Sequence, residues 1–258
     1  SGGPAGGAYA GASSQHHPVS LQLTRDGKRV RTLFIRVNAD SCTSPTFNPT
    51  VTLEVDPSEA VRLHADGKFS DTSQITGETV VDGKRLDFQA VLKGRVGTTR
   101  AAGTIRLFGP VRDAAGNIVD TCDSGVVRWA LARGPGVYGG ATDQFGAVSV
   151  RVDGGRRQVR VFFVDFRVTC GSSTFAYSIR HAVRAPVRRD GSFSKRGLSG
   201  IPIKTPEGAT ITGRFALDGK VGSRQASGTY RASGTLRQPD GSRLSCDTGA
   251  VKWTARSA

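Results

Sequence analysis

The sequence repeats itself over nearly its whole length, and this duplication constrains the fold more than any other feature. The clearest match ends each copy, where Cys122-Asp-Ser-Gly-Val-Val-Arg-Trp129 returns as Cys246-Asp-Thr-Gly-Ala-Val-Lys-Trp253. The openings match as well, since Tyr9-Ala-Gly-Ala-Ser-Ser-Gln15 returns as Tyr138-Gly-Gly-Ala-Thr-Asp-Gln144. We therefore predict a flexible leader over 1–8 and two homologous domains, 9–133 and 138–258, joined by a turn-rich seam at 133–136.

The hydrophobic pattern within each copy has a period of two. Val19, Leu21 and Leu23 alternate with polar residues, which is typical of a half-buried strand. Asp-Gly, a strong hairpin signal, occurs at 26, 66, 82, 153, 190, 218 and 240. Only 56–59, with Pro57 after a capping Asp56, resembles the start of a short helix. The sequence thus predicts an all-β fold of two antiparallel domains with about eight strands each, either up-and-down β-barrels or, as second choice, β-sandwiches.

Four cysteines occupy matched places in the two copies, at the end of the expected second strand and just before the last. Four cysteines allow three pairings, and two equivalent domains favour Cys42 with Cys122 and Cys170 with Cys246. Zinc binding is the alternative, but there is no Cys-x-x-Cys and the histidines do not recur. We expect one disulfide per domain, no metal and no cofactor, in a secreted, cell-surface or periplasmic protein.

The first 17 residues do not resemble a targeting segment. Residues 1–17 are rich in Gly, Ala and Ser, with neither a basic nor an apolar region, so a signal peptide is expected to have been removed. His16 and His17 are expected to be a solvated pair in this stretch. The longest apolar runs, such as 161–164, are far shorter than the roughly 20 residues of a membrane-spanning helix, so no transmembrane segment is expected.

The strongest catalytic hint is the pair of triplets Asp123-Ser-Gly125 and Asp247-Thr-Gly249. They resemble the two loops of aspartic proteases, whose adjacent carboxylates share one proton. In that family strands that build the cleft follow each loop, whereas here only about ten residues follow before each copy ends. The alternative is that each triplet forms a turn ahead of a strand carrying a core tryptophan. No phosphate-binding loop or positioned histidine supports another chemistry, so we expect a protein that is not an enzyme.

The charge of +15 is unevenly divided between the copies. Residues 1–133 hold 16 basic and 13 acidic side chains, and the remainder hold 20 and 8, giving net charges of +3 and +12. The arginines that form the expected basic surface are Arg156, Arg157, Arg180, Arg184, Arg188 and Arg189. They predict an anionic partner such as an envelope or glycan polyanion, although arginine-rich composition or solubility would also explain them. Nucleic acid is not expected, because no aromatic side chains interleave these arginines.

One strand of each copy carries apolar residues on both faces. Phe34 precedes Arg36 on the second face of the first copy, and Phe163 precedes Arg167 in the second. A contact between the domains would explain this pattern. The other interpretation is a pocket for an apolar or amphipathic acid, such as a fatty acid, lined by Phe34, Arg36, Arg160, Phe163 and Arg167. The leading hypothesis is therefore an exported binding protein for such a ligand, with polyanion binding or a protein-interaction or inhibitor module as alternatives.

Overall fold

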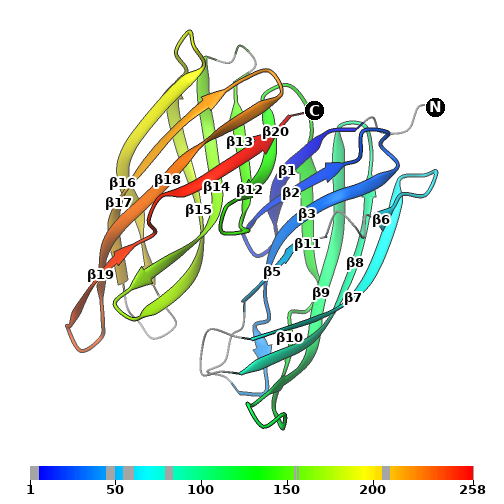
Figure 1. Ribbon diagram of the computed structural model, residues 1–258, viewed down its shortest axis with the longest axis vertical. Helices are drawn as coiled ribbons and strands as arrows, with labels where there is room; N and C mark the ends of the chain where they lie inside the picture. Colours follow the sequence, from blue (N-terminus) through cyan, green and yellow to red (C-terminus); the bar gives the residue numbers. More distant parts are fainter. Residues whose placement is uncertain are drawn as a thin grey trace.

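The computed structural model describes residues 6–44, 50–54, 61–78, 84–153, 155, 157–204 and 210–257, and these contain strands but no helix (Figure 1). The first copy forms β1 (Ala8–Ser13), β2 (Pro18–Leu23), β3 (Arg29–Asn38), β4 (Ser41–Cys42), β5 (Thr50–Glu54), β6 (Val61–Arg62), β7 (Lys68–Glu78), β8 (Arg85–Val96), β9 (Arg100–Arg112), β10 (Ile118–Asp123) and β11 (Val127–Ala132). The second forms β12 (Val137–Thr142), β13 (Ala147–Val152), β14 (Gln158–Cys170), β15 (Ser173–Pro186), β16 (Ser192–Lys204), β17 (Thr210–Val221), β18 (Gln225–Arg237), β19 (Arg243–Asp247) and β20 (Val251–Arg256). The helix expected at 56–59 lies outside the described residues.

Each copy builds its own antiparallel sheet, which confirms the predicted fold class. The first sheet runs β4-β10-β9-β11-β1-β2-β3-β5 with β8 and β7 continuing from β9, and it curves into a half-barrel. The second runs β15-β14-β13-β12-β20-β18-β17-β16. Because β19 pairs with both β14 and β18, strands β12, β13, β14, β19, β18 and β20 close into a six-stranded barrel.

The strand counts exceed the expected eight because long strands are interrupted. In both copies the Asp-Ser-Gly or Asp-Thr-Gly triplet divides the last strand, giving β10 and β11 in the first and β19 and β20 in the second. In the first copy β3 and β4 together correspond to β14, and β5 and β6 to β15. The first strand also starts earlier than the expected boundary, since Ala8, assigned to the leader, is buried in β1.

Both predicted disulfides are confirmed. Cys42 of β4 bonds Cys122 of β10, and Cys170 of β14 bonds Cys246 of β19. In each case the two cysteines lie directly opposite one another on antiparallel neighbours. Cys170 ends the third strand of its copy rather than the second, so the sequence pattern missed one strand ahead of it. Each bridge fixes the broken last strand to the opposite side of its own sheet.

Each domain has a separate apolar core centred on its matched tryptophan. Trp129 lies 6.2 Å from Phe69 between ring centroids in the first domain, and Trp253 lies 5.2 Å from Phe162 in the second. Both tryptophans are 2% exposed. The triplets place them there by ending one strand and starting the next.

The two domains pack against each other through the outer faces of matching strands. Strands β1, β2 and β3 contact β12, β13 and β14, in a pattern that is symmetric between the copies (Figure 1). The approach is close, because a Cβ on Gly139 would lie 2.6 Å from the Tyr9 carbonyl oxygen. Ser20 Oγ of β2 also donates a hydrogen bond of 2.7 Å to the Gly140 carbonyl of β12. The small residues at the start of each copy thus allow the sheets to touch.

Candidate functional site

A buried polar cluster lies at the domain contact. Arg36 of β3 and Asp165 of β14 form an ion pair of 3.6 Å, and their side chains are only 2% and 3% exposed. Ser178 of β15 donates to Asp165 Oδ1 and accepts from Arg36 Nη1 at 3.2 Å. His17 Nδ1 also bonds the Ser178 hydroxyl. When Asp165 is ionised the Ser178 hydroxyl donates to the carboxylate, so Nδ1 is then the protonated ring nitrogen and the donor. The cluster therefore joins the domains through four polar side chains.

Several residues at and around this cluster lie elsewhere than the sequence predicted. Phe34 and Phe163 are buried beside it and belong to neither domain core, so their second apolar face is covered by the domain contact. His17, expected to be solvated, is half-buried within the cluster, whereas His16 is exposed. Arg160 and Arg167, grouped with Phe34 and Arg36 as ligand-binding candidates, are exposed on β14. The structure thus divides that group between the contact and the surface.

Burial dominates the electrostatics of the cluster. It raises the pKa of Asp165 to about 7, against the opposing effects of Arg36 and the Ser178 hydrogen bond. Burial, followed by repulsion from Arg36, lowers the pKa of His17 to about 4. Asp165 Oδ2, Arg36 Nε and His17 Nε2 have no hydrogen-bond partner among the described residues. Since the carboxylate bonds the serine and not the histidine, the group lacks the arrangement of a nucleophilic triad.

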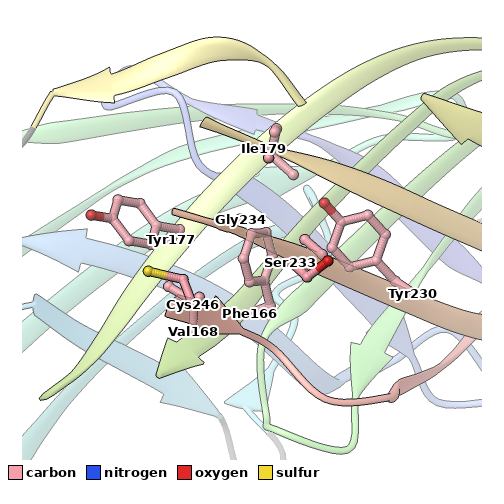
Figure 2. A pocket seen from close by; sticks show the side chains of 10 residues that line it. Phe166, Val168, Tyr177, Ile179, Tyr230, Ser233, Gly234 and Cys246 are labelled. Carbon is pink, nitrogen blue, oxygen red and sulfur yellow. The ribbon is translucent and has the colours of Figure 1, made fainter. Parts of the chain in front are cut away.

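A small apolar pocket opens in the second domain between β14 and β15 on one side and β18 on the other (Figure 2). Phe166, Val168, Ile179 and Tyr230 contribute to its wall, together with the disulfide at Cys246. Its volume of about 30 Å³ corresponds to roughly one water molecule. The pocket as it stands therefore has no room for an acyl chain.

A buried histidine lies close to this pocket. His181 Nε2 is 3.1 Å from the Tyr230 hydroxyl, and the imidazole stacks on Phe215 at 3.9 Å. Burial lowers the pKa of His181 to about 4, so the ring is neutral at neutral pH. Ile179, His181 and Val183 alternate with exposed residues along β15 and face inward. This alternation is the sequence signal that could have predicted the burial of His181.

The two Asp-Ser/Thr-Gly triplets form matching turns. Asp123 pairs with Arg106 and accepts the Gly125 N–H at 2.7 Å, where Gly125 has a φ of 61°. Asp247 is held by Arg231 in the same way. Hydrogen bonds from these arginines are the main reason that the pKa of each aspartate is lowered. Each carboxylate is therefore bonded within its own domain.

One cluster of metal-ligand types occurs near the first disulfide. Sγ of Cys42 and Cys122 and a carboxylate oxygen of Asp120 lie within 4.8 Å of one another. The two sulfur atoms are bonded to each other, and Asp120 accepts the backbone N–H groups of Thr43 and Thr121 at 2.9 and 2.7 Å. The carboxylate thus holds the loop at the disulfide.

Most of the predicted basic surface lies on β15 and the turn that follows. The exposed residues of this group are Arg157, Arg180, Arg184, Arg188 and Arg189, while Arg156 lies outside the described residues. Arg180 and Arg184 project from the outer face of β15, because His181 and Val183 face inward. Within the part of the chain that the structure describes, none of these arginines forms an ion pair with a carboxylate.

No protein-family model and no curated protein matches the sequence. One solved structure, of a protein provisionally described as an outer membrane protein from Bacteroides fragilis, is 9% identical and aligns over 98% of this chain and 97% of that chain, with a TM-score of 0.23. No helix among the described residues could span a membrane.

Proposed function

We propose that this is a non-catalytic binding protein of an oxidising compartment outside the cytoplasm, and that the second domain binds anionic polymers through the outer face of β15. The two disulfides support the compartment, because such bonds form and persist mainly in exported proteins. The observation that carries the binding function is the row of exposed arginines, which have no carboxylate partner among the residues that the structure describes. An exported glycan or envelope polymer with repeated negative charges is the partner of matching chemistry.

The spacing of these arginines suits a polymer better than a small ligand. Arg180 and Arg184 are four residues apart on β15, which separates them by at most roughly 13 Å at about 3.3 Å per residue, because a β-bulge at Arg184 shortens this part of the strand. Arg188 and Arg189 continue the positive charge into the next turn. Charges spread along a strand can contact successive anionic groups of one chain, so the affinity should depend strongly on salt.

The test is binding of the full-length protein to heparin over a range of salt concentrations. Arg180→Gln combined with Arg184→Gln should weaken binding at least tenfold and reduce its salt dependence. The matched control is Arg100→Gln with Arg128→Gln, which removes two exposed arginines from the first domain. Equal weakening by the control pair would show that binding follows net charge alone and would refute the assignment to β15.

Ligand binding inside the second domain is a second candidate, favoured by the apolar pocket of Figure 2. A fatty acid would bind there only if β15 moved away from β18, since the present volume admits about one water molecule. An environment-sensitive fatty-acid probe tests this, because Ala232→Phe should fill the pocket and abolish binding. Probe binding that is unaffected by this variant, or no binding at all, would reject the pocket.

The non-catalytic part of the proposal has its own test. Asp123→Asn combined with Asp247→Asn should remove no hydrolytic activity, because each carboxylate holds a turn and an arginine of its own domain. Acid-dependent peptide cleavage by the native protein that is lost in this double variant would instead show that the two aspartates act together.

A further inference from the structure

A second pocket lies at one end of the domain contact and differs in chemistry from the apolar one. It has a volume of about 160 Å³. The first domain contributes Gln22, Arg25 and Arg31 to its lining, and the second contributes Arg256 and Ser257. Three arginines from two domains thus surround one cavity.

Strand pairing fixes the backbone at two of the three arginines. Arg31 is the extra residue of a β-bulge, because Gln22 pairs with Thr32 while the next residue of β2 pairs with Val30. A bulge of this kind turns a side chain away from its ordinary direction on the strand. Arg256 ends β20 and is paired on one side with Gly139 and on the other with Gln225. Arg31 and Arg256 are therefore anchored in paired strands, whereas Arg25 lies in the turn between β2 and β3.

The pocket walls are also tied together. Gln22 Nε2 of the first domain donates a hydrogen bond of 3.3 Å to the Gly139 carbonyl of the second. Ser257 is bonded through its backbone N–H to the Arg224 carbonyl at 3.0 Å and through its hydroxyl to the Ser223 carbonyl at 3.0 Å. Both walls are thus positioned by contacts that do not involve the arginines.

The three arginines of this pocket are exposed and have no carboxylate partner among the described residues. No carboxylate lines the cavity, and within the described residues Arg25, Arg31 and Arg256 form no ion pair. Three positive charges around one cavity repel one another, and an anion that they share removes that repulsion. Guanidinium groups present paired N–H donors that match the oxygen atoms of phosphate or carboxylate.

We propose that this pocket binds a small phosphate-type oxyanion, either free phosphate or the phosphoryl group of a headgroup. The volume equals about five water molecules at roughly 30 Å³ each, and it is below the range of about 300–1,000 Å³ for drug-sized ligands. The site is separate from the polymer-binding face of β15 proposed above. Since both domains supply arginines, the bound anion also links them.

The experiment titrates the full-length protein with inorganic phosphate in dilute buffer free of other oxyanions, by calorimetry and by thermal unfolding. We expect one site per chain and a rise in the unfolding temperature. Arg31→Gln and Arg256→Gln should each weaken binding at least tenfold, and Arg31→Lys should weaken it less because it keeps the charge. A parallel titration with glycerol 3-phosphate represents the headgroup. The ligand that binds more tightly shows whether the pocket takes free phosphate or the phosphoryl group of a headgroup.

The matched control is Arg160→Gln. Arg160 occupies the equivalent bulge of the second copy, because Arg151 pairs with Val161 while Val152 pairs with Val159. Arg160 is exposed and does not line the pocket. It should leave phosphate binding within twofold of the native value. Equal weakening by this control, or no saturable binding by a natively folded protein, would overturn the proposal. Because heparin binding is assigned to Arg180 and Arg184, either proposal can fail without the other.

Discussion

Replacing Arg36 with methionine should destabilise the protein by an amount that depends on pH. The variant removes the only positive partner within 4 Å of the buried Asp165 carboxylate among the described residues. Above the Asp165 pKa of about 7, a buried charge then has no ion-pair partner, which typically costs about 3–5 kcal/mol. Near pH 5.5 the carboxyl group is protonated in both proteins. The cost should then fall to about 1 kcal/mol, the value of a lost hydrogen bond.

The native protein should show the same titration in its own stability. The folded pKa of Asp165, about 7, lies above the model value of 3.8, so the stabilisation from protonation is complete below pH 3.8 and is lost as pH rises to about 7. Three pKa units correspond to about 4 kcal/mol. His17 and His181 oppose this, because burial lowers the pKa of each from 6.5 to about 4 and their contributions are lost as pH falls through that range. In the Asp165→Asn variant, the free energy of unfolding should therefore only rise with pH between about 4 and 6.5.

Urea unfolding at pH 5.5 and pH 8.5, followed by tryptophan fluorescence, measures both effects. Trp129 and Trp253 report one domain each, so separate transitions would be visible. Arg29→Met is the control, because Arg29 is exposed on the same strand and should cost less than about 0.5 kcal/mol. A cost for Arg36→Met that is the same at both pH values would refute the reasoning, since it would show that the charge of Asp165 plays no part.

Two further predictions concern the disulfides and the close contact between sheets. Cys42→Ala with Cys122→Ala opens a loop with a sequence separation of 80 residues, and should lower the free energy of unfolding by about 4 kcal/mol, measured by urea unfolding against the disulfide-bonded native protein. Gly139→Ala would place a Cβ 2.6 Å from the Tyr9 carbonyl oxygen, so it should cost about 1–3 kcal/mol by forcing the domains apart. Gly97→Ala, whose nearest atom would be 3.4 Å away, should cost less in the same assay, and equal costs would contradict the close contact.

The sequence predicted the fold class and the disulfides because both follow from local patterns repeated twice. Alternation and Asp-Gly turns specify hairpins, and two copies of one fold must each pair their own cysteines. The number of strands was underestimated for an equally local reason. Asp123 and Gly125 break a strand without reversing it, since β10 and β11 both pair with β9.

The domain contact was only partly predictable, because it depends on which outer faces meet. The apolar residues Phe34 and Phe163 marked those faces, and the structure buries both. His17 and Ser178 gave no signal, since a histidine in a glycine-rich stretch and a serine on a polar face are ordinary surface residues in sequence. Their role appears only when the residue before β2 and a residue of β15 are brought together from distant parts of the chain.

The matched positions of Arg36 and Asp165 explain why each domain packs against the other domain and not against a copy of itself. The two residues are 129 positions apart, the same offset as Tyr9 and Tyr138, and Phe34 and Phe163 share it. In a contact between two identical domains, a residue near the axis meets its own copy. Self-pairing of the first domain would therefore bury two arginines, and self-pairing of the second would bury two aspartates. Either arrangement leaves like charges together in a desolvated site, whereas the two different domains bury one of each. Divergence at this single position thus favours contact between the two halves over association of like halves.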